Sequence, residues 1–158
     1  MNRTATAVDV TAMLTWPART ITAKDKCASR TGKERSVFSV TAYVRRIKLH
    51  ETDGDWHIEI TEEEYTPVPA SCIVVEIPAP AYGDVYRQAR DQLAALVDTT
   101  HLTTNGDLDA PVLVTFTGAA FFDGYHQKTT STAANMRASM GAAIRRSARY
   151  GSCIPFTP

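Results

Sequence analysis

The feature that most constrains the fold of this chain is an Asp-Gly step at residues 53–54, between two β-like runs. Glycine accepts the positive φ that tight hairpin turns need, so the step predicts a β-hairpin. The residues that follow the turn alternate between apolar and polar side chains, as one strand requires. The alternation assigns two sets of residues to opposite faces: Trp56, Ile58 and Ile60 to one, and Asp55, His57 and Glu59 to the other.

The run before the turn predicts a long, irregular strand that starts at Ser36. Its apolar positions alternate from Phe38 to Val44, and the alternation then slips by one position at Arg45 and Arg46. A slip of one register within a long strand indicates a β-bulge, which strongly curved sheets use.

The later segments complete the order β-β-β-α-β. A β-branched strand is predicted over residues 72–78, a helix from Gly83 or Asp84 to Val97, and a strand over 112–117 that continues to 123. This order predicts a mainly β fold, a small OB-like Greek-key barrel with one packed helix. The remaining candidate for a fifth strand is 152–156, where Pro155 disfavours a central position.

Three regions are expected along the chain: an N-terminal arm (1–35), the OB-like β-barrel domain (36–126) and a basic, partly helical C-terminal extension (127–158). Trp16 is expected to dock on the domain. The extension includes an Ala-rich stretch at 133–149, where Met136, Met140 and Ile144 recur at a spacing of four residues. That spacing predicts a C-terminal helix.

Length and composition predict a protein of the cytoplasm with no membrane partner. The chain has 158 residues, no apolar run near the roughly 20 residues of a membrane span, and no apolar signal segment at its start. Its three cysteines are widely spaced and odd in number, which favours reduced thiols. The oligomeric state is left open.

The net charge of zero hides a strong asymmetry along the chain. Residues 17–50 hold nine Lys or Arg and two acids, residues 51–126 hold fourteen acids and two arginines, and residues 127–158 hold five basic residues and no acid. Either the basic flanks offset the acidic middle, or they bind a nucleic acid or another acidic partner. The expected binding residues on the first strand are Tyr43, Arg45, Arg46 and Lys48. Trp56 belongs to the apolar series, which favours a core position.

Three stretches together resemble a group of uncharacterised bacterial proteins. They are Asp53 to Ile58, Val74 to Pro78 and Thr117 to His126, with the pattern D-x-D-x-H, E-h-P and G-x-x-F-F-D-x-x-H. The resemblance covers roughly residues 36–126 and implies an OB-like barrel. Members of the group tend to finish with a Glu-Leu-His-Pro-like strand, which the tail from Gly151 replaces here.

The same stretches supply side chains that bind divalent metals. The candidate ligands are Asp55, His57, Glu76, Asp123 and His126. Imidazole with carboxylates suits Zn²⁺, Mn²⁺ or Fe²⁺, and a bound metal generates hydroxide for hydrolysis. The competing interpretation is structural: Asp53 and Asp55 are typical turn residues, and His57 pairs with a neighbouring carboxylate or carbonyl.

Three functions follow as hypotheses. The first is a non-enzymatic OB-like module that binds nucleic acid or another polyanion. The second is a metal-dependent hydrolase or nuclease that uses His57, Glu76, Asp123 and His126. The third is a protein–protein accessory domain that displays the charged arms.

Overall fold

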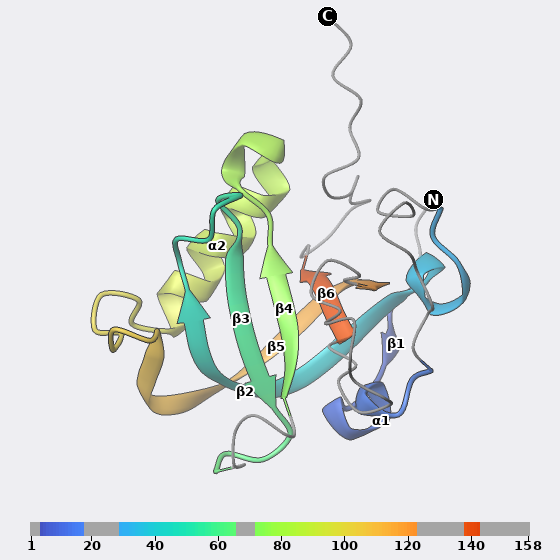
Figure 1. Ribbon diagram of the computed structural model, residues 1–158, viewed down its shortest axis with the longest axis horizontal. Helices are drawn as coiled ribbons and strands as arrows, with labels where there is room; N and C mark the ends of the chain where they lie inside the picture. The colour runs from blue at the N-terminus through green and yellow to red at the C-terminus, as the bar shows by residue number, and fades with distance from the viewer. Residues whose placement is uncertain (1–3, 18–28, 66–71, 123–137, 143–158) are drawn as a thin grey trace, which may run out of the picture.

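The computed structural model describes residues 4–17, 29–65, 72–122 and 138–142, and these form a mainly β body around one mixed sheet of six strands (Figure 1). The strands are β1 (Thr6–Ala7), β2 (Val37–Lys48), β3 (Trp56–Thr61), β4 (Cys72–Ile77), β5 (Asp107–Phe122) and β6 (Ala138–Ala142). The helices are α1 (Val10–Leu14) and α2 (Asp84–Leu96), with single 3₁₀ turns η2 (Gly32–Arg35) and η3 (Pro80–Tyr82).

The predicted hairpin is confirmed. β2 and β3 are antiparallel, and the turn between them places Gly54 at a φ of 80°. The Gly54 N–H donates to the Glu51 carbonyl over 2.9 Å, and the Asp55 N–H donates to the Asp53 carboxylate over 3.1 Å. Gly54 therefore supplies the left-handed backbone and Asp53 supplies the side-chain acceptor that such turns use.

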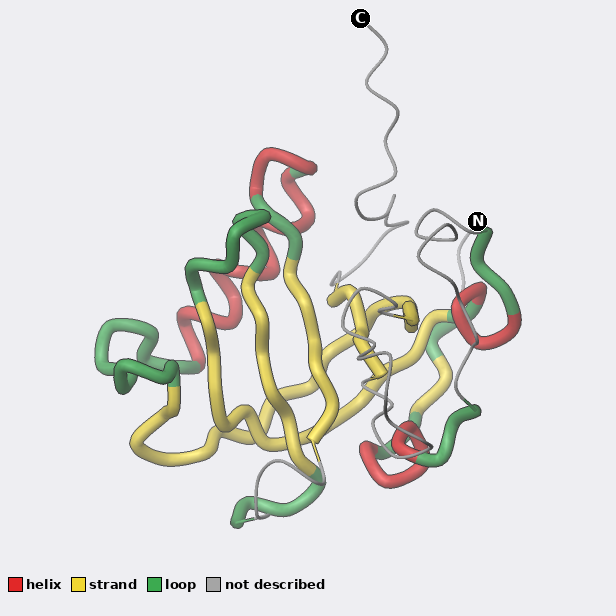
Figure 2. The backbone as a smooth tube through the Cα atoms, in the orientation of Figure 1, coloured by secondary structure: helices red, strands yellow, loops and turns green. Residues whose placement is uncertain are grey.

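The predicted bulge in β2 is also confirmed. The register between β2 and β3 passes from Val44–Ile60 to Arg46–Glu59, so Arg45 is an extra residue. The ladder between β2 and β5 shifts between the same two β2 residues. A bulge bends and twists its strand, and β2 and β5 are strongly curved in Figure 2. The curvature lets β2 pair with β3 along one edge and with β5 along the other.

The strand order in the sheet is β1-β2-β3-β4-β6-β5, with a further pairing between β2 and β5. β6 lies between β4, to which it is parallel, and β5, to which it is antiparallel. The short β1 pairs in parallel with β2 at Phe38 and Ser39. The predicted strands at 72–78 and 112–117 are β4 and part of β5, and the predicted helix from 83 or 84 is α2.

The C-terminal prediction needs a correction at β6. The sequence predicts a helix over 133–149, whereas the described part of that stretch, 138–142, is a strand. Ala-rich composition is a weak helix signal that tertiary context overrides, and Gly141 disfavours a helix by about 1 kcal/mol relative to Ala. Between β4 and β5 the segment gains backbone partners on both sides, which a solvated helix would not provide. The alternative strand at 152–156 lies outside the described residues.

The core lies inside the curved sheet and is extended by both helices, which lie at opposite ends of the sheet (Figure 1). Its fully buried members alternate along the strands, and α2 adds its buried face. These core residues include Val40, Val44, Ile47, Ile58, Ile60, Ile73, Val75, Ile77, Tyr86, Ala89 and Leu93.

Part of the predicted N-terminal arm packs on this body. Asp9 caps α1 by accepting the Ala12 N–H, and Val10 and Met13 are fully buried. The ring of Trp16 lies 4.8 Å from that of Phe38, measured between centroids, so the expected docking of Trp16 is confirmed.

Arg90 on α2 holds the hairpin turn against the helix. Its Nη2 donates to the carbonyls of Gly54 at 2.7 Å and Ile77 at 2.8 Å. Its guanidinium lies 5.0 Å from the ring centroid of Trp56, a cation–π contact. These contacts fix the position of the turn relative to the end of β4.

A second glycine, Gly106, joins the loop before β5 to the end of β2. Its φ is 84°, and the Ile47 N–H donates to its carbonyl over 2.8 Å. A Cβ at this position would lie 2.3 Å from the Ile47 carbonyl oxygen. Any other residue would therefore force the two segments apart.

Within the described residues, no helix is long and apolar enough to cross a membrane.

Candidate ligand-binding face

The polar side chains of three adjacent strands gather on the surface of β2, β3 and β4 that points away from the core. We call this surface the outer face. The strand registers arrange it in three cross-strand rows: Lys48–His57–Glu76, Arg46–Glu59–Val74 and Tyr43–Thr61–Cys72. Period-2 alternation explains the arrangement, because the residues between these positions, such as Ile47, Ile58 and Val75, enter the core.

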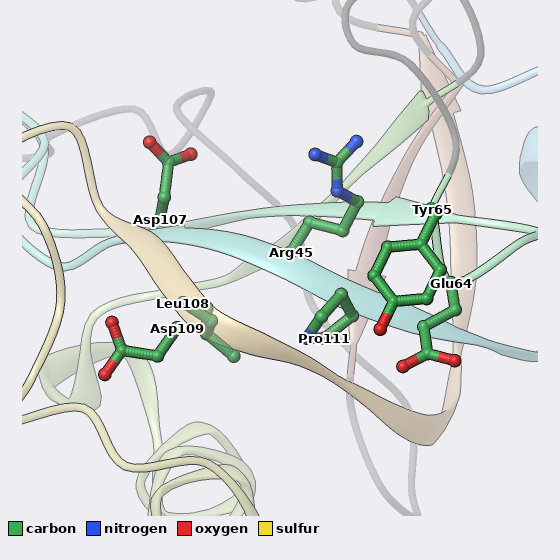
Figure 3. Close-up of a pocket in the computed structure, with 7 residues that line it drawn as sticks. All are labelled: Arg45, Glu64, Tyr65, Asp107, Leu108, Asp109 and Pro111. Atoms are coloured by element: carbon green, nitrogen blue, oxygen red, sulfur yellow. The ribbon is translucent and has the colours of Figure 1, made fainter.

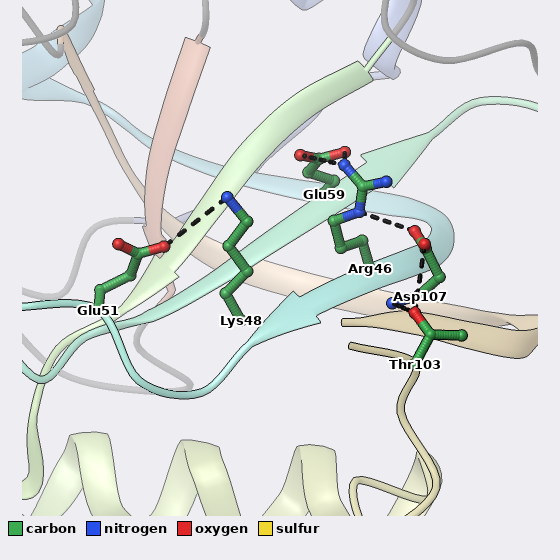
Figure 4. Close-up of polar contacts among 6 residues, drawn as sticks. All are labelled: Arg46, Lys48, Glu51, Glu59, Thr103 and Asp107. Atoms are coloured by element: carbon green, nitrogen blue, oxygen red, sulfur yellow. Dashed lines mark hydrogen bonds and ion pairs between the residues drawn. The ribbon is translucent and has the colours of Figure 1, made fainter. Parts of the chain in front are cut away.

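The first row brings together residues that the sequence assigns to two different sites. Lys48 is predicted as a cation for a polyanion, and His57 and Glu76 as metal ligands, yet all three are cross-strand neighbours. The Nδ1 of His57 lies 3.7 Å from Oε1 of Glu76. Lys48 is half exposed and its Nζ lies 3.9 Å from Oε1 of Glu51 (Figure 4).

His57 is the unusual member of this row. The residue is 8% exposed, and its buried Nε2 has no hydrogen-bond partner among the described residues. A buried polar atom without a partner costs about 1–3 kcal/mol, so such atoms are rare in folded proteins. The His57 imidazole therefore lowers the stability of the fold, and it lies next to the Glu76 carboxylate, which can orient it.

The second row is an ion-paired network that joins three strands. Arg46 donates from Nε to Asp107 over 2.7 Å and from Nη1 to Glu59 over 3.3 Å (Figure 4). Asp107 also accepts from the Thr103 hydroxyl, and its own N–H donates to that hydroxyl. The hydrogen bond from Arg46 holds the pKa of Asp107 below its usual value, and the same bond raises the pKa of Arg46. Arg46 is thus engaged by carboxylates and links β2, β3 and β5.

Asp55 has a structural position. Its carboxylate accepts the Ala79 N–H over 2.9 Å and ties the turn after β2 to the residues after β4. Burial raises the pKa of Asp55, and the Ala79 N–H and Arg90 act against that rise. This contact agrees with the interpretation of Asp55 as a turn residue.

The described residues include only some of the predicted metal ligands. His57 and Glu76 are adjacent, while Asp123 and His126 lie outside the described residues. Within residues 4–17, 29–65, 72–122 and 138–142, no three His, Cys, Asp or Glu side chains converge on a point that could hold a metal ion. Metal binding by this cluster remains a prediction.

Arg45 is not part of the outer face, because it is the extra residue of the bulge and belongs to none of the three rows. It lines a cleft of about 380 Å³ beside the start of β5 (Figure 3). The other residues that line this cleft are Glu64, Tyr65, Asp107, Leu108, Asp109 and Pro111. Tyr65 is 82% exposed, more than any other large hydrophobic side chain in the described part of the chain.

Three residues of these sites were missed by the sequence reasoning. Alternation along the strand predicts that Glu59 shares a face with His57. It does not predict that Glu59 pairs with Arg46. Asp107 lies between the helix predicted to end at Val97 and the strand predicted over 112–117, next to Asn105-Gly106, a step that indicates a turn. Tyr65 stands in a loop between strands, where no periodic signal exists.

The charges segregate between the described and the remaining residues. The described residues contain eight Lys or Arg and fifteen Asp or Glu, whereas the remaining ones contain nine Lys or Arg and two acids. The described body alone is therefore acidic.

Comparison with protein-family models, curated proteins and solved structures finds no match to this chain.

Proposed function

We propose that this protein is an OB-like binding module for nucleic acid or another polyanion. The observation that carries the proposal is the strand order. β2 pairs with both β3 and β5, and β6 lies between β4 and β5 in one mixed sheet. Five strands in this order, with the third and fifth parallel and a helix before the fourth, suit an OB-like Greek-key barrel.

The position of the outer face supports a binding role. OB-folds bind oligonucleotides and oligosaccharides on the face of their second and third strands. In this chain those strands are β3 and β4, and the row Lys48–His57–Glu76 crosses them. Tyr43 and Lys48 add an aromatic ring and a half-exposed ammonium group at one edge.

The cations for a polyanion come mostly from outside the outer face. Arg46 is held by Glu59 and Asp107, and Lys48 lies near Glu51, so these two residues offer little net positive charge. The excess positive charge resides in the sequence at 18–28 and 123–158. We infer that phosphates are neutralised by these basic stretches, while Tyr43, Lys48 and Glu76, which are more accessible than the buried residues of the outer face, contact bases or sugars.

A salt titration of single-stranded DNA tests this proposal. A labelled oligonucleotide of mixed sequence is titrated with the full chain at several salt concentrations, and the logarithm of the association constant is plotted against that of salt. A protein that neutralises Z phosphates on a single strand gives a slope of about −0.7Z. A slope of about −2 or steeper supports the proposal, and absence of binding at low salt rejects it.

The second candidate is a metal-dependent hydrolase, favoured by one observation. The unpartnered Nε2 of buried His57, with Glu76 near its Nδ1, is the arrangement in which a carboxylate orients a metal-binding imidazole. In this arrangement the described residues supply one donor, His57, of the four that a zinc site uses. Further ligands would come from water or from Asp123 and His126.

Metal analysis separates the two candidates. The full chain is incubated with Zn²⁺ or Mn²⁺, desalted, and assayed for bound metal and for thermal stability with and without EDTA. Stoichiometric metal that is lost in both His57→Ala and His126→Ala variants favours the hydrolase. If neither metal is retained, His57 is a structural or ligand-contacting residue, and the hydrolase candidate is rejected.

A further inference from the structure

The cleft beside Arg45 has the chemistry of a subsite for a single nucleobase. It is formed where the bulge of β2 meets an irregularity in β5: Val44 pairs with Val112 and Arg46 with Asp107, so four residues of β5 lie opposite Arg45 alone. These four residues leave the ladder, and two of them, Leu108 and Pro111, line the cleft with apolar atoms. Figure 3 shows the cleft between this segment and Tyr65.

We propose that this cleft binds one base of a single-stranded nucleic acid, with guanine as the preferred base. The proposal rests on the function proposed above and adds a site and a base preference to it. Tyr65 carries the first part of the argument, because an aromatic ring that is 82% exposed is a ready stacking surface. Base–aromatic stacking is the main contact by which proteins hold single strands.

The charged residues of the cleft argue for a base and against a phosphate. Three carboxylates, those of Glu64, Asp107 and Asp109, line it with a single Arg45. Asp107 is neutralised by Arg46 at 2.7 Å. Glu64 keeps its negative charge while it accepts a hydrogen bond from the Tyr65 hydroxyl, so Glu64 and Asp109 together outnumber Arg45. A phosphate would meet net repulsion there, whereas a neutral base with N–H donors would find acceptors.

Guanine matches this set of groups better than the other bases. A carboxylate accepts two parallel hydrogen bonds, and guanine presents its N1–H and N2–H donors on one edge. Guanine also carries the O6 and N7 acceptors to which arginine commonly donates. Adenine and cytosine each offer one amino group, and thymine offers a single N–H. The cleft therefore favours guanine through Glu64 or Asp109 together with Arg45.

The cleft also adjoins the outer face, which makes one continuous path for a strand. Asp107 lines the cleft and accepts a hydrogen bond from Arg46, which belongs to the second row of the outer face. A strand that crosses β3 and β4 can thus place one of its bases beside Tyr65.

The test uses the full chain and labelled oligonucleotides of roughly twelve thymines, either unmodified or with one central guanine or one central hypoxanthine. The wild-type protein is expected to bind the guanine strand several-fold more tightly than the thymine strand. Hypoxanthine lacks the amino group of guanine, so it should lose most of this advantage. Equal affinity for the three strands would overturn the base preference.

Variants locate the site. Tyr65→Ala should weaken binding of the guanine strand roughly tenfold, and Tyr65→Phe should not, because the stacking surface is kept. Tyr82→Ala is the matched control, since Tyr82 is also an exposed tyrosine (56%) but lies away from the cleft. Asp109→Asn and Glu64→Gln together should remove the guanine preference.

The outcomes separate this inference from the function on which it rests. If the wild-type protein binds oligonucleotides but Tyr65→Ala and Tyr82→Ala bind equally well, the cleft is not a base subsite and the binding function stands. If the wild-type protein binds none of the strands at low salt, the proposed function fails and the subsite fails with it.

Discussion

The Nδ1 of His57 lies 3.7 Å from Oε1 of Glu76, directly across the ladder between β3 and β4, while the buried Nε2 of the same ring has no hydrogen-bond partner in the part of the chain that the structure describes. One side of the imidazole thus faces a carboxylate, and the other meets no acceptor or donor from residues 4–17, 29–65, 72–122 or 138–142. A ring in this state contributes little to folding, because its buried Nε2 offsets what its contacts provide.

This relationship predicts that His57 is dispensable for stability. His57→Leu removes the unpartnered nitrogen and keeps an apolar side chain on the buried outer face. The free energy of unfolding, measured by urea denaturation, is expected to stay within about 1 kcal/mol of the wild-type value. A decrease of about 3 kcal/mol would show that the ring is an integral part of the packing and would weaken the case for a functional role.

Arg46 is predicted to be a structural residue of the outer face. Arg46→Leu leaves Glu59, whose side chain is 9% exposed, without its cation, and a buried unpaired carboxylate is expensive. We expect a decrease of about 3 kcal/mol in the free energy of unfolding. The double variant Arg46→Leu with Glu59→Leu should recover most of that stability, since it removes both charges. Failure of the second substitution to recover stability would contradict this account.

Asp107 is predicted to make the stability of the fold depend on acid pH. Its pKa is lowered in the folded protein from an ordinary value of 3.8, chiefly by the hydrogen bond from Arg46. A carboxyl with a lowered folded pKa stabilises the fold fully above its unfolded pKa and loses that contribution as pH falls through the folded pKa. The wild-type advantage over Asp107→Asn should therefore be constant above about pH 5 and shrink below pH 3.8. A stability difference between wild type and Asp107→Asn that grows as pH falls would contradict a lowered pKa of Asp107 in the folded protein.

Gly106 is predicted to tolerate no side chain. Gly106→Ala meets both the left-handed backbone, which costs about 1–2 kcal/mol, and a distance of 2.3 Å from the new Cβ to the Ile47 carbonyl oxygen. Gly32→Ala is the matched control, because Gly32 also has a positive φ but nothing lies within 4 Å of its added Cβ. The decrease in the free energy of unfolding should be clearly larger at Gly106. Equal decreases would indicate that the approach of Gly106 to Ile47 is not rigid.

The sequence predicted those features that depend on local chemistry. The Asp-Gly turn, the slip at Arg45 and Arg46, and the helix from Asp84 all follow from glycine conformation or from side-chain periodicity. Alternation also places Lys48, Arg46, His57 and Glu76 away from the core. The partners of these residues do not follow, because a register between strands depends on bulges and turn geometry together.

The features that the sequence reasoning missed depend on tertiary context. Residues 138–142 have helix-forming composition but occupy a strand position between β4 and β5. β5 begins at Asp107, before the strand predicted over 112–117, and its ladder partner there is Arg46, which follows the bulge of β2. The resemblance to the group of uncharacterised bacterial proteins likewise stays a prediction.

The basic stretches outside the described residues are predicted to set the salt dependence of nucleic-acid binding. Changing Arg145, Arg146 and Arg149 to Gln removes three of the nine cations there. The salt slope for single-stranded DNA should become shallower by up to about 2, because each phosphate that is no longer neutralised reduces it by about 0.7. Arg87→Gln is the control, because Arg87 is an exposed residue of α2 paired with Asp84. An equal change in both variants would show that these basic residues do not neutralise the phosphates.

The most direct test of the central claim is the affinity of the full wild-type chain for a mixed-sequence single-stranded DNA across a range of salt concentrations. The protein is expected to bind this DNA measurably at low salt, with a logarithmic slope of about −2 or steeper. The absence of binding at low salt, or an affinity that does not change with salt, would contradict that claim.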